Sequence, residues 1–219
     1  MASILQIFQG FKIGAPGWFF MWLLLISAVF MIAISIERIY FIAIRANINA
    51  SKFMADIRGL LTAGKFKDAL GLSASVKTKA LPYVVYTCLS RLGQKGQVDF
   101  RTAQNAVDEG TLETIPKLQE RTNYLAMIGN VATLLGLMGT IYGLILAFNS
   151  VSAPGIDAAE KSRLLAAGIS TAMNTTLVGL SVAIPAILVY NYVHSKTMKI
   201  IDEIDEHSVK LINLLTGNS

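Results

Sequence analysis

Residues 122–148, "TNYLAMIGNVATLLGLMGTIYGLILAF", form an apolar stretch that is long enough to cross a lipid bilayer. Small and hydroxyl-bearing residues interrupt it at alternating steps of four and three positions, a spacing that places them on one face of an α-helix. This stripe comprises Gly129, Thr133, Gly136, Thr140, Gly143 and Ala147. The pattern predicts a membrane helix with one narrow, smooth face.

A second stretch, residues 164–192, repeats the pattern. Its stripe comprises Gly168, Ala172, Thr176, Gly179, Ala183 and Ala186. Small residues let two membrane helices approach closely, and threonine hydroxyls can hydrogen-bond to a neighbouring helix. We therefore predict a close-packing stripe whose glycines are Gly129, Gly136, Gly143, Gly168 and Gly179.

The hydroxyl groups on these two stretches favour a second role, the lining of an ion pathway. The candidate pore-lining residues are Thr133, Thr140, Thr171, Asn174, Thr175 and Thr176. The first apolar stretch, residues 18–36, carries no comparable stripe. This difference indicates that it lies outside the two striped helices. Helix packing without any ion pathway stays open as the alternative.

The composition indicates an integral membrane protein. Of the 219 residues, 53% are hydrophobic and only 15% are charged, against about 25% in an average soluble domain. Three tracts without charges reach the roughly 20 residues that a membrane helix needs. The first begins with Trp18 and Trp22, which are placed like interfacial anchors. Because this tract is too long for the apolar part of a signal peptide and ends in charged residues, we expect a retained anchor.

Charged, glycine and proline residues divide the chain into segments. We expect an all-α integral membrane protein with three transmembrane helices, with long helices extending into a cytoplasmic helical domain. The predicted segments are a periplasmic N-terminal segment (1–17), the first transmembrane helix and its exit (18–44), a cytoplasmic helical region (45–121), the second transmembrane helix (122–148), a periplasmic link (149–163), the third transmembrane helix (164–192) and a cytoplasmic C-terminal helix (193–219). We expect charged helix to lead straight into the second span.

The distribution of lysine and arginine predicts the orientation. The segment before the first span carries only Lys12, and the link between the second and third spans carries Lys161 and Arg163. Most other basic residues lie in the 45–121 region and in the tail. Because segments rich in lysine and arginine stay in the cytoplasm, we expect a periplasmic N-terminus and a cytoplasmic C-terminus.

Residues 122–148 and 164–192 contain no Asp, Glu, Lys, Arg or His. A protein that moves ions needs a group in the membrane that titrates or coordinates, so the carboxylate would have to come from another chain. Elsewhere, His194 and His207 lack the spacing of metal ligands. We expect the single cysteine, Cys88, to be a buried thiol. The sequence predicts no enzyme, no cofactor, no metal site and no nucleic-acid partner.

Two local features have more than one interpretation. Pro185 cannot donate a hydrogen bond to the carbonyl of Ser181, so a bend is expected in the third span, either as a gating hinge or as a packing kink. Glu37 and Arg38 at the exit of the first span are expected to form an interfacial charge pair, and docking of a partner is the alternative.

Two segments, "LQERTNYLAMIGNVATLLGLMGTIYGLILAF" (118–148) and "AAGISTAMNTTLVGLSVAIPAILVYNYV" (166–193), carry a resemblance to a known family. Through them the chain resembles the MotA/TolQ/ExbB proton channel family, and its three-span ExbB/TolQ-like branch more than the four-span MotA type. The resemblance implies a bacterial inner-membrane homopentamer whose second and third spans line a central pore. It also implies a partner, an ExbD/TolR-like dimer of single-span chains. The membrane Asp of that partner would take up and release protons. The proton flow through the complex would then be converted into mechanical work.

The resemblance assigns pore-lining roles to two residues, Thr140 in "GLMGT" and Thr176 in "NTTLVGL". The chain departs from the family pattern at two other positions. Thr133 stands where many relatives have proline, and Thr171 stands where many have glutamate. The loss of that glutamate strengthens the expectation that the carboxylate comes from another chain. A non-conducting membrane scaffold, in which the small-residue stripes only pack helices, is the alternative function.

Overall fold

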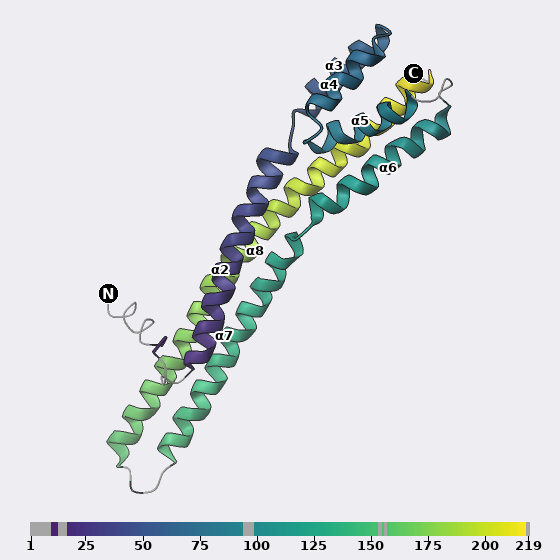
Figure 1. The fold of residues 1–219 in the computed structure, drawn as a ribbon. Helices are drawn as coiled ribbons and strands as arrows, with labels where there is room; N and C mark the ends of the chain where they lie inside the picture. The colour runs from purple at the N-terminus through teal and green to yellow at the C-terminus, as the bar shows by residue number, and fades with distance from the viewer. Residues whose placement is uncertain (1–9, 13–16, 94–98, 153–154, 156, 218–219) are drawn as a thin grey trace. The chain divides into compact units, whose positions relative to one another are not determined.

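The computed structural model describes residues 10–12, 17–93, 99–152, 155 and 157–217 (Figure 1). All regular secondary structure in these residues is helical. The helices are α2 (Trp18–Tyr40), the π-helical η1 (Phe41–Ala46), α3 (Ala50–Thr62), α4 (Phe66–Ser75), α5 (Ala80–Leu92), α6 (Phe100–Gln119), α7 (Thr122–Val151) and α8 (Ala158–Thr216). The all-α prediction is therefore confirmed for the described part of the chain.

Three helical runs are long and apolar enough to cross a membrane. They are Trp18–Thr62, which contains α2, η1 and α3, Phe100–Val151, which contains α6 and α7, and Ala158–Thr216, which is α8. This agrees with the prediction of three membrane-spanning helices, by length and composition. The predicted segments 1–17 and 149–163 lie partly outside the described residues.

The first of two compact units comprises Met1–Ile36 and Thr122–Asn191. Within it, α2 packs against both α7 and the first part of α8 (Figure 1). One cluster joins Leu24 of α2 to Ala132 of α7 and to Val182 of α8. The other side of α2 is exposed, with Phe30 at 61% and Ile36 at 66%. Such an apolar face fits contact with lipid, as the composition of this span predicts.

The second unit comprises Glu37–Arg121 and Tyr192–Ser219. Its helices α5 and α6 pack as a hairpin, because Gly110 of α6 leaves room for the backbone of α5: a Cβ atom there would lie 3.1 Å from the Cα atom of Val84. Leu89 and Leu92 of α5 are buried in this unit. The described residues of the 45–121 region are thus largely helical, as the sequence predicts.

Helix α8 runs without interruption over 59 residues and contains Pro185. The proline removes one backbone hydrogen bond, yet the residues on both sides of it stay helical. The hydroxyl of Ser181, the residue whose carbonyl loses its partner, donates to the carbonyl oxygen of Leu177 at 2.8 Å. The proline is therefore accommodated within one continuous helix.

Charged helix does not lead straight into the second span, and this expectation was wrong. Helix α6 ends at Gln119, and Arg121 adopts a left-handed backbone conformation with φ of 59° before α7 begins at Thr122. A left-handed residue stops an α-helix because it turns the chain out of the helical path. The break thus lies at Glu120 and Arg121.

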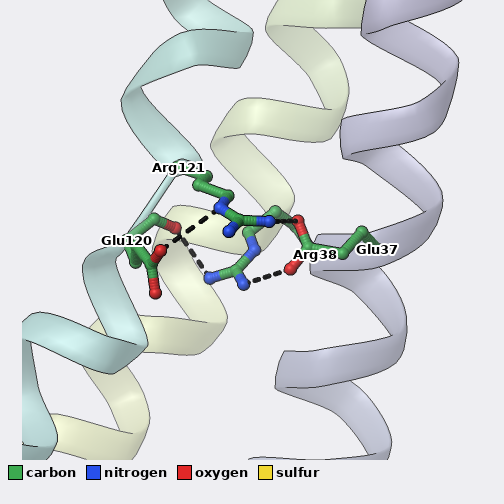
Figure 2. Close-up of polar contacts among 4 residues, drawn as sticks. All are labelled: Glu37, Arg38, Glu120 and Arg121. Carbon is green, nitrogen blue, oxygen red and sulfur yellow. Dashed lines mark hydrogen bonds and ion pairs between the residues drawn. The ribbon is translucent and has the colours of Figure 1, made fainter.

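A cluster of charged residues surrounds this break (Figure 2). Arg38 Nη1 donates to the carbonyl oxygen of Glu120 at 2.7 Å, and its Nη2 atom pairs with the carboxylate of Glu37. Arg121 reaches Glu37 at 3.6 Å and Glu120 at 3.2 Å. Only 3% of Arg38 is exposed, and its guanidinium lies 4.8 Å from the centre of the Phe41 ring. The predicted Glu37–Arg38 pair is therefore part of a four-residue network.

The rate at which a maleimide labels Cys88 tests the buried position of this residue in the second unit. The residue is fully buried in α5, and burial raises the pKa of its thiol to about 12. Because the thiolate is the reactive form, we expect a fluorogenic maleimide at pH 8 to label the native chain at least about 100-fold more slowly than the unfolded chain. Equal labelling rates in detergent and in denaturant would contradict the buried position.

The same thiol reports on the role of Arg38. In Arg38→Met the carbonyl of Glu120 and the carboxylate of Glu37 lose a charged donor. This loss lowers the free energy of unfolding by about 2 kcal/mol. We expect the temperature of half-maximal Cys88 labelling to fall by about 4–8 °C. The control is Arg91→Met, because Arg91 pairs with Glu109 on the surface, where such a pair contributes about 1 kcal/mol or less. A smaller shift in Arg38→Met than in the control would refute the structural role of the network.

Candidate functional site

Helices α7 and α8 approach each other most closely where two glycines meet. A Cβ atom on Gly179 would lie 2.7 Å from the carbonyl oxygen of Ala132 and 2.9 Å from the Cα atom of Gly136. A Cβ atom on Gly136 would lie 3.2 Å from the Cα atom of Gly179. Both helices therefore touch through their backbones, which is possible because neither residue has a side chain.

All five predicted packing glycines lie along this contact. A Cβ atom on Gly129 would meet Ile187 at 3.0 Å, and one on Gly143 would meet Ala172 at 2.9 Å. A Cβ atom on Gly168 would overlap the side chain of Ala147. The contact thus extends over most of the length of α7.

Two members of the buried face were missed in the sequence. Ala132 and Gly139 are buried against α8, and a Cβ atom on Gly139 would lie 2.6 Å from Thr175 Oγ1. Thr133, which the predicted stripe places on this face, is exposed. From Gly129, steps of three and then four lead through Ala132 to Gly136, and steps of four and then three lead through Thr133 to Gly136. Both series lie on one face of a helix, so the spacing alone does not decide which of them faces α8. Residue size distinguishes the two series, because the smaller residues, Ala132 and Gly139, occupy the positions closest to α8.

Hydroxyl groups gather beside the glycine contact. The Thr140 and Thr176 hydroxyls hydrogen-bond to each other across the two helices. Both also lie near the carbonyl oxygen of Gly136, Thr176 Oγ1 at 3.0 Å and Thr140 Oγ1 at 3.2 Å. Because each hydroxyl carries a single hydrogen, these bonds compete, and the hydroxyls can change partners by rotation.

Thr175 completes the cluster from the buried side. Its hydroxyl donates to the carbonyl oxygen of Ala172 at 2.7 Å, and Thr140 Oγ1 lies 3.3 Å from the same oxygen. Only 2% of Thr175 is exposed, whereas Thr140 and Thr176 are half-buried. The structure thus brings together three of the six candidate pore-lining residues.

The other three candidates lie apart from this cluster. Thr133 Oγ1 donates to the carbonyl oxygen of Gly129 at 3.0 Å, and Thr171 Oγ1 donates to that of Ala167 at 2.9 Å. Each of these bonds stays within one helix. Asn174 is half-buried on α8.

The cluster consists of groups that remain neutral at ordinary pH. Hydroxyls and backbone carbonyls can order water and pass on hydrogen bonds, but they cannot carry the charge of a proton. Among the described residues, no group of three or more His, Cys, Asp or Glu side chains is arranged to hold a metal ion. The Thr140–Thr175–Thr176 cluster therefore contains hydrogen-bonding groups but no acidic group of its own.

Comparison with known proteins identifies a family match. Residues 77–206 match the model of the MotA/TolQ/ExbB proton channel family. The chain is 34% identical to the Tol-Pal system protein TolQ of Haemophilus influenzae over 41% of each chain. It is 31% identical to the putative biopolymer transport protein ExbB-like 3 of Synechocystis over 75% of each chain.

Other matches agree with this result. The chain is 38% identical to the putative biopolymer transport protein ExbB-like 2 of Helicobacter pylori, and the match covers 36% of the chain and 51% of the relative. The chain thus spans about half or less of the length of this relative and of TolQ. The structure of MotAB from C. jejuni has the same fold, with a TM-score of 0.60 at 16% identity, covering 85% of this chain and 69% of that one.

We expect replacement of glycine by alanine to have opposite effects on stability at Gly179, in the contact, and at Gly71, outside it. Gly179→Ala places a methyl group against the backbone of α7, which costs about 1–3 kcal/mol. Gly71→Ala is the control: Gly71 lies inside α4 with open space around it, so alanine should stabilise that helix by about 0.5–1 kcal/mol. We expect thermal unfolding, followed by far-ultraviolet circular dichroism, to shift downward for Gly179→Ala and not for Gly71→Ala. An unchanged unfolding temperature in Gly179→Ala would contradict the close approach.

Proposed function

The chain belongs to the MotA/TolQ/ExbB proton channel family, and we propose that it is the proton-channel (stator) subunit of an inner-membrane motor complex. The complex converts proton motive force into mechanical work through an ExbD/TolR-like partner. The observation that carries the proposal is the Thr140–Thr176 hydroxyl pair within two helices that lack charged residues. It lies inside the segment that matches the family.

The partner supplies the acid in this proposal. Since residues 122–148 and 164–192 contain no ionisable Asp, Glu, Lys, Arg or His, the titrating group is the membrane Asp of the single-span partner. The half-buried hydroxyls of Thr140 and Thr176 hydrogen-bond to water and to that carboxyl group. Because each hydroxyl already has several acceptors within reach, it can donate or accept without leaving an unsatisfied group.

The remaining candidates have secondary roles in the pathway. Thr175 lies beside Thr140 on the buried side, where the carbonyl oxygen of Ala172 is an acceptor for both hydroxyls. The proposed lining continues away from this cluster through Thr133, Thr171 and Asn174. Pro185 is proposed as the hinge of α8, where one backbone hydrogen bond is missing.

Assembly and orientation belong to the same proposal. We expect a homopentamer around a central pore, with a periplasmic N-terminus and a cytoplasmic C-terminus. The distribution of lysine and arginine supports the orientation. Exposed apolar residues of α7, such as Leu134, Leu137 and Ile141, support contacts with further subunits or with lipid.

A non-conducting scaffold is the second candidate, and a specific observation favours it. The predicted stripes pack α7 on α8 within one chain, and the Thr140 and Thr176 hydroxyls bond to each other and to the backbone. Packing thus accounts for these residues without an ion pathway. The two candidates differ in whether the hydroxyls are needed once assembly is intact.

Valine substitution separates the two functions. Thr140→Val and Thr176→Val keep the shape of the side chain and remove the hydroxyl. We expect each to lower proton flux at least about tenfold, because a pathway that loses one hydrogen bond of about 1.4 kcal/mol in its rate-limiting state slows by that factor. Flux would be measured with a pH-sensitive dye inside liposomes that contain the chain and its single-span partner, under an imposed membrane potential.

The control is Ser27→Ala in the first span. Its hydroxyl donates only within α2, to the carbonyl oxygen of Leu23, so flux should stay unchanged. Size-exclusion chromatography would verify that all variants assemble. Full flux in both threonine variants with assembly intact would reject the pore-lining assignment. Flux of the unchanged complex no greater than that of protein-free liposomes would favour the scaffold.

A further inference from the structure

A cavity of about 440 Å³ lies within the second unit, between η1, the residues that precede α5, α5 itself and α6. Its volume is in the range of small-ligand sites. The charged residues of its wall are Arg45, Lys77, Lys79, Lys117 and Glu120. Four of these side chains are basic and one is acidic, so the wall has an excess of positive charge.

Ion pairing removes some of these charges and leaves others. Lys117 pairs with Glu113 at 2.8 Å, and Glu120 pairs with Arg121 at 3.2 Å, so these two charges are balanced. The ammonium group of Lys79 donates to the carbonyl oxygen of Ile44, a neutral group that leaves the charge of the lysine in place. Arg45, Lys77 and Lys79 therefore give the cavity its positive potential.

The start of α5 adds to this potential. Ala80, the first residue of the helix, lines the cavity, and Lys79 occupies the N-cap position. A lysine side chain cannot accept a hydrogen bond from the amide groups of the first turn. The positive end of a 13-residue helix is thus present at the same wall as the three basic side chains.

Aromatic and apolar residues complete the wall. Phe41 and Leu118 line the cavity together with Tyr83. The hydroxyl of Tyr83 donates to the carboxylate of Glu113 at 2.6 Å, which fixes the ring beside Lys117. A ligand that fits this wall carries a compact anionic group and an uncharged part.

We propose that this cavity binds the phosphate of an anionic ligand. Arginine and lysine side chains with a helix N-terminus are the groups that proteins use for phosphate. Two sources have this chemistry, the headgroup of an anionic phospholipid and a soluble phosphate ester. The residues of the cavity wall do not include Thr140 or Thr176, and the proposed binding does not depend on proton conduction.

The sequence positions of the cavity-lining residues favour a phospholipid headgroup as the source of the phosphate. Phe41 and Arg45 follow directly after α2, the helix that contains the first apolar span. A chain that crosses the bilayer through residues 18–36 brings these residues to the headgroup region or just beyond it. Basic residues at this position on the cytoplasmic side attract anionic headgroups.

Binding to the purified full-length chain tests the proposal. Native mass spectrometry in a non-ionic detergent would count bound molecules during titration with phosphatidylglycerol, phosphatidylcholine or glycerol 1-phosphate. The double variant Arg45→Gln/Lys77→Gln removes two exposed charges of the cavity. The control, Lys52→Gln/Lys67→Gln, removes two exposed charges from α3 and α4 of the same unit.

We expect phosphatidylglycerol to bind more tightly than phosphatidylcholine, and the cavity variant to weaken its binding about fivefold for each lost charge. The control variant should bind like the unchanged chain. Saturable binding of glycerol 1-phosphate with the same loss, and no preference between the lipids, would support the phosphate site and assign it to a soluble ligand. Equal losses in the cavity and control variants, or no saturable binding of any of the three probes, would overturn the proposal.

Discussion

Helices α7 and α8 approach each other closely enough at Gly136 and Gly179 that one added methyl group would push against the backbone of the opposite helix. The arrangement of the first unit depends on this contact. It brings Thr140 within hydrogen-bonding distance of Thr176, and it places the carbonyl of Gly136 near both hydroxyls. In a membrane, apolar surface gives no driving force for helix association, so close packing and interhelical hydrogen bonds hold such helices together.

In the proposed function, helix packing and proton conduction use the same residues. A hydroxyl that bonds to a neighbouring helix is satisfied in the membrane interior, and it can still exchange its partner for water or for a carboxyl group. A charged residue at that depth would be costly in every state of the complex. The proposed neutral lining, with an acid on a separate chain, would avoid this cost in the isolated subunit.

The second unit is held together in a different way. Arg38 is almost fully buried and links Glu37 to the carbonyl of Glu120 at the break between α6 and α7 (Figure 2). The charge of Arg38 is balanced by the Glu37 carboxylate, and Nη1 and Nη2 each donate to an acceptor, although the buried Nε has no hydrogen-bond partner. The left-handed Arg121 ends the helical path beside this network. The second unit thus combines a buried apolar core in α5 with the polar contacts of Arg38, whereas backbone proximity dominates the first unit.

The sequence by itself determined the helical class, the three apolar spans and the spacing of glycine and threonine, because these depend on local composition and helical periodicity. Tertiary structure decided which register of α7 faces α8: Ala132 and Gly139 are buried there, while Thr133 is exposed. Periodicity allows both registers, and the bulk of each side chain at the contact selects one. The break at Arg121 likewise comes with a contact that only the tertiary structure shows, because Arg38, far away in the sequence, donates to the carbonyl oxygen of Glu120.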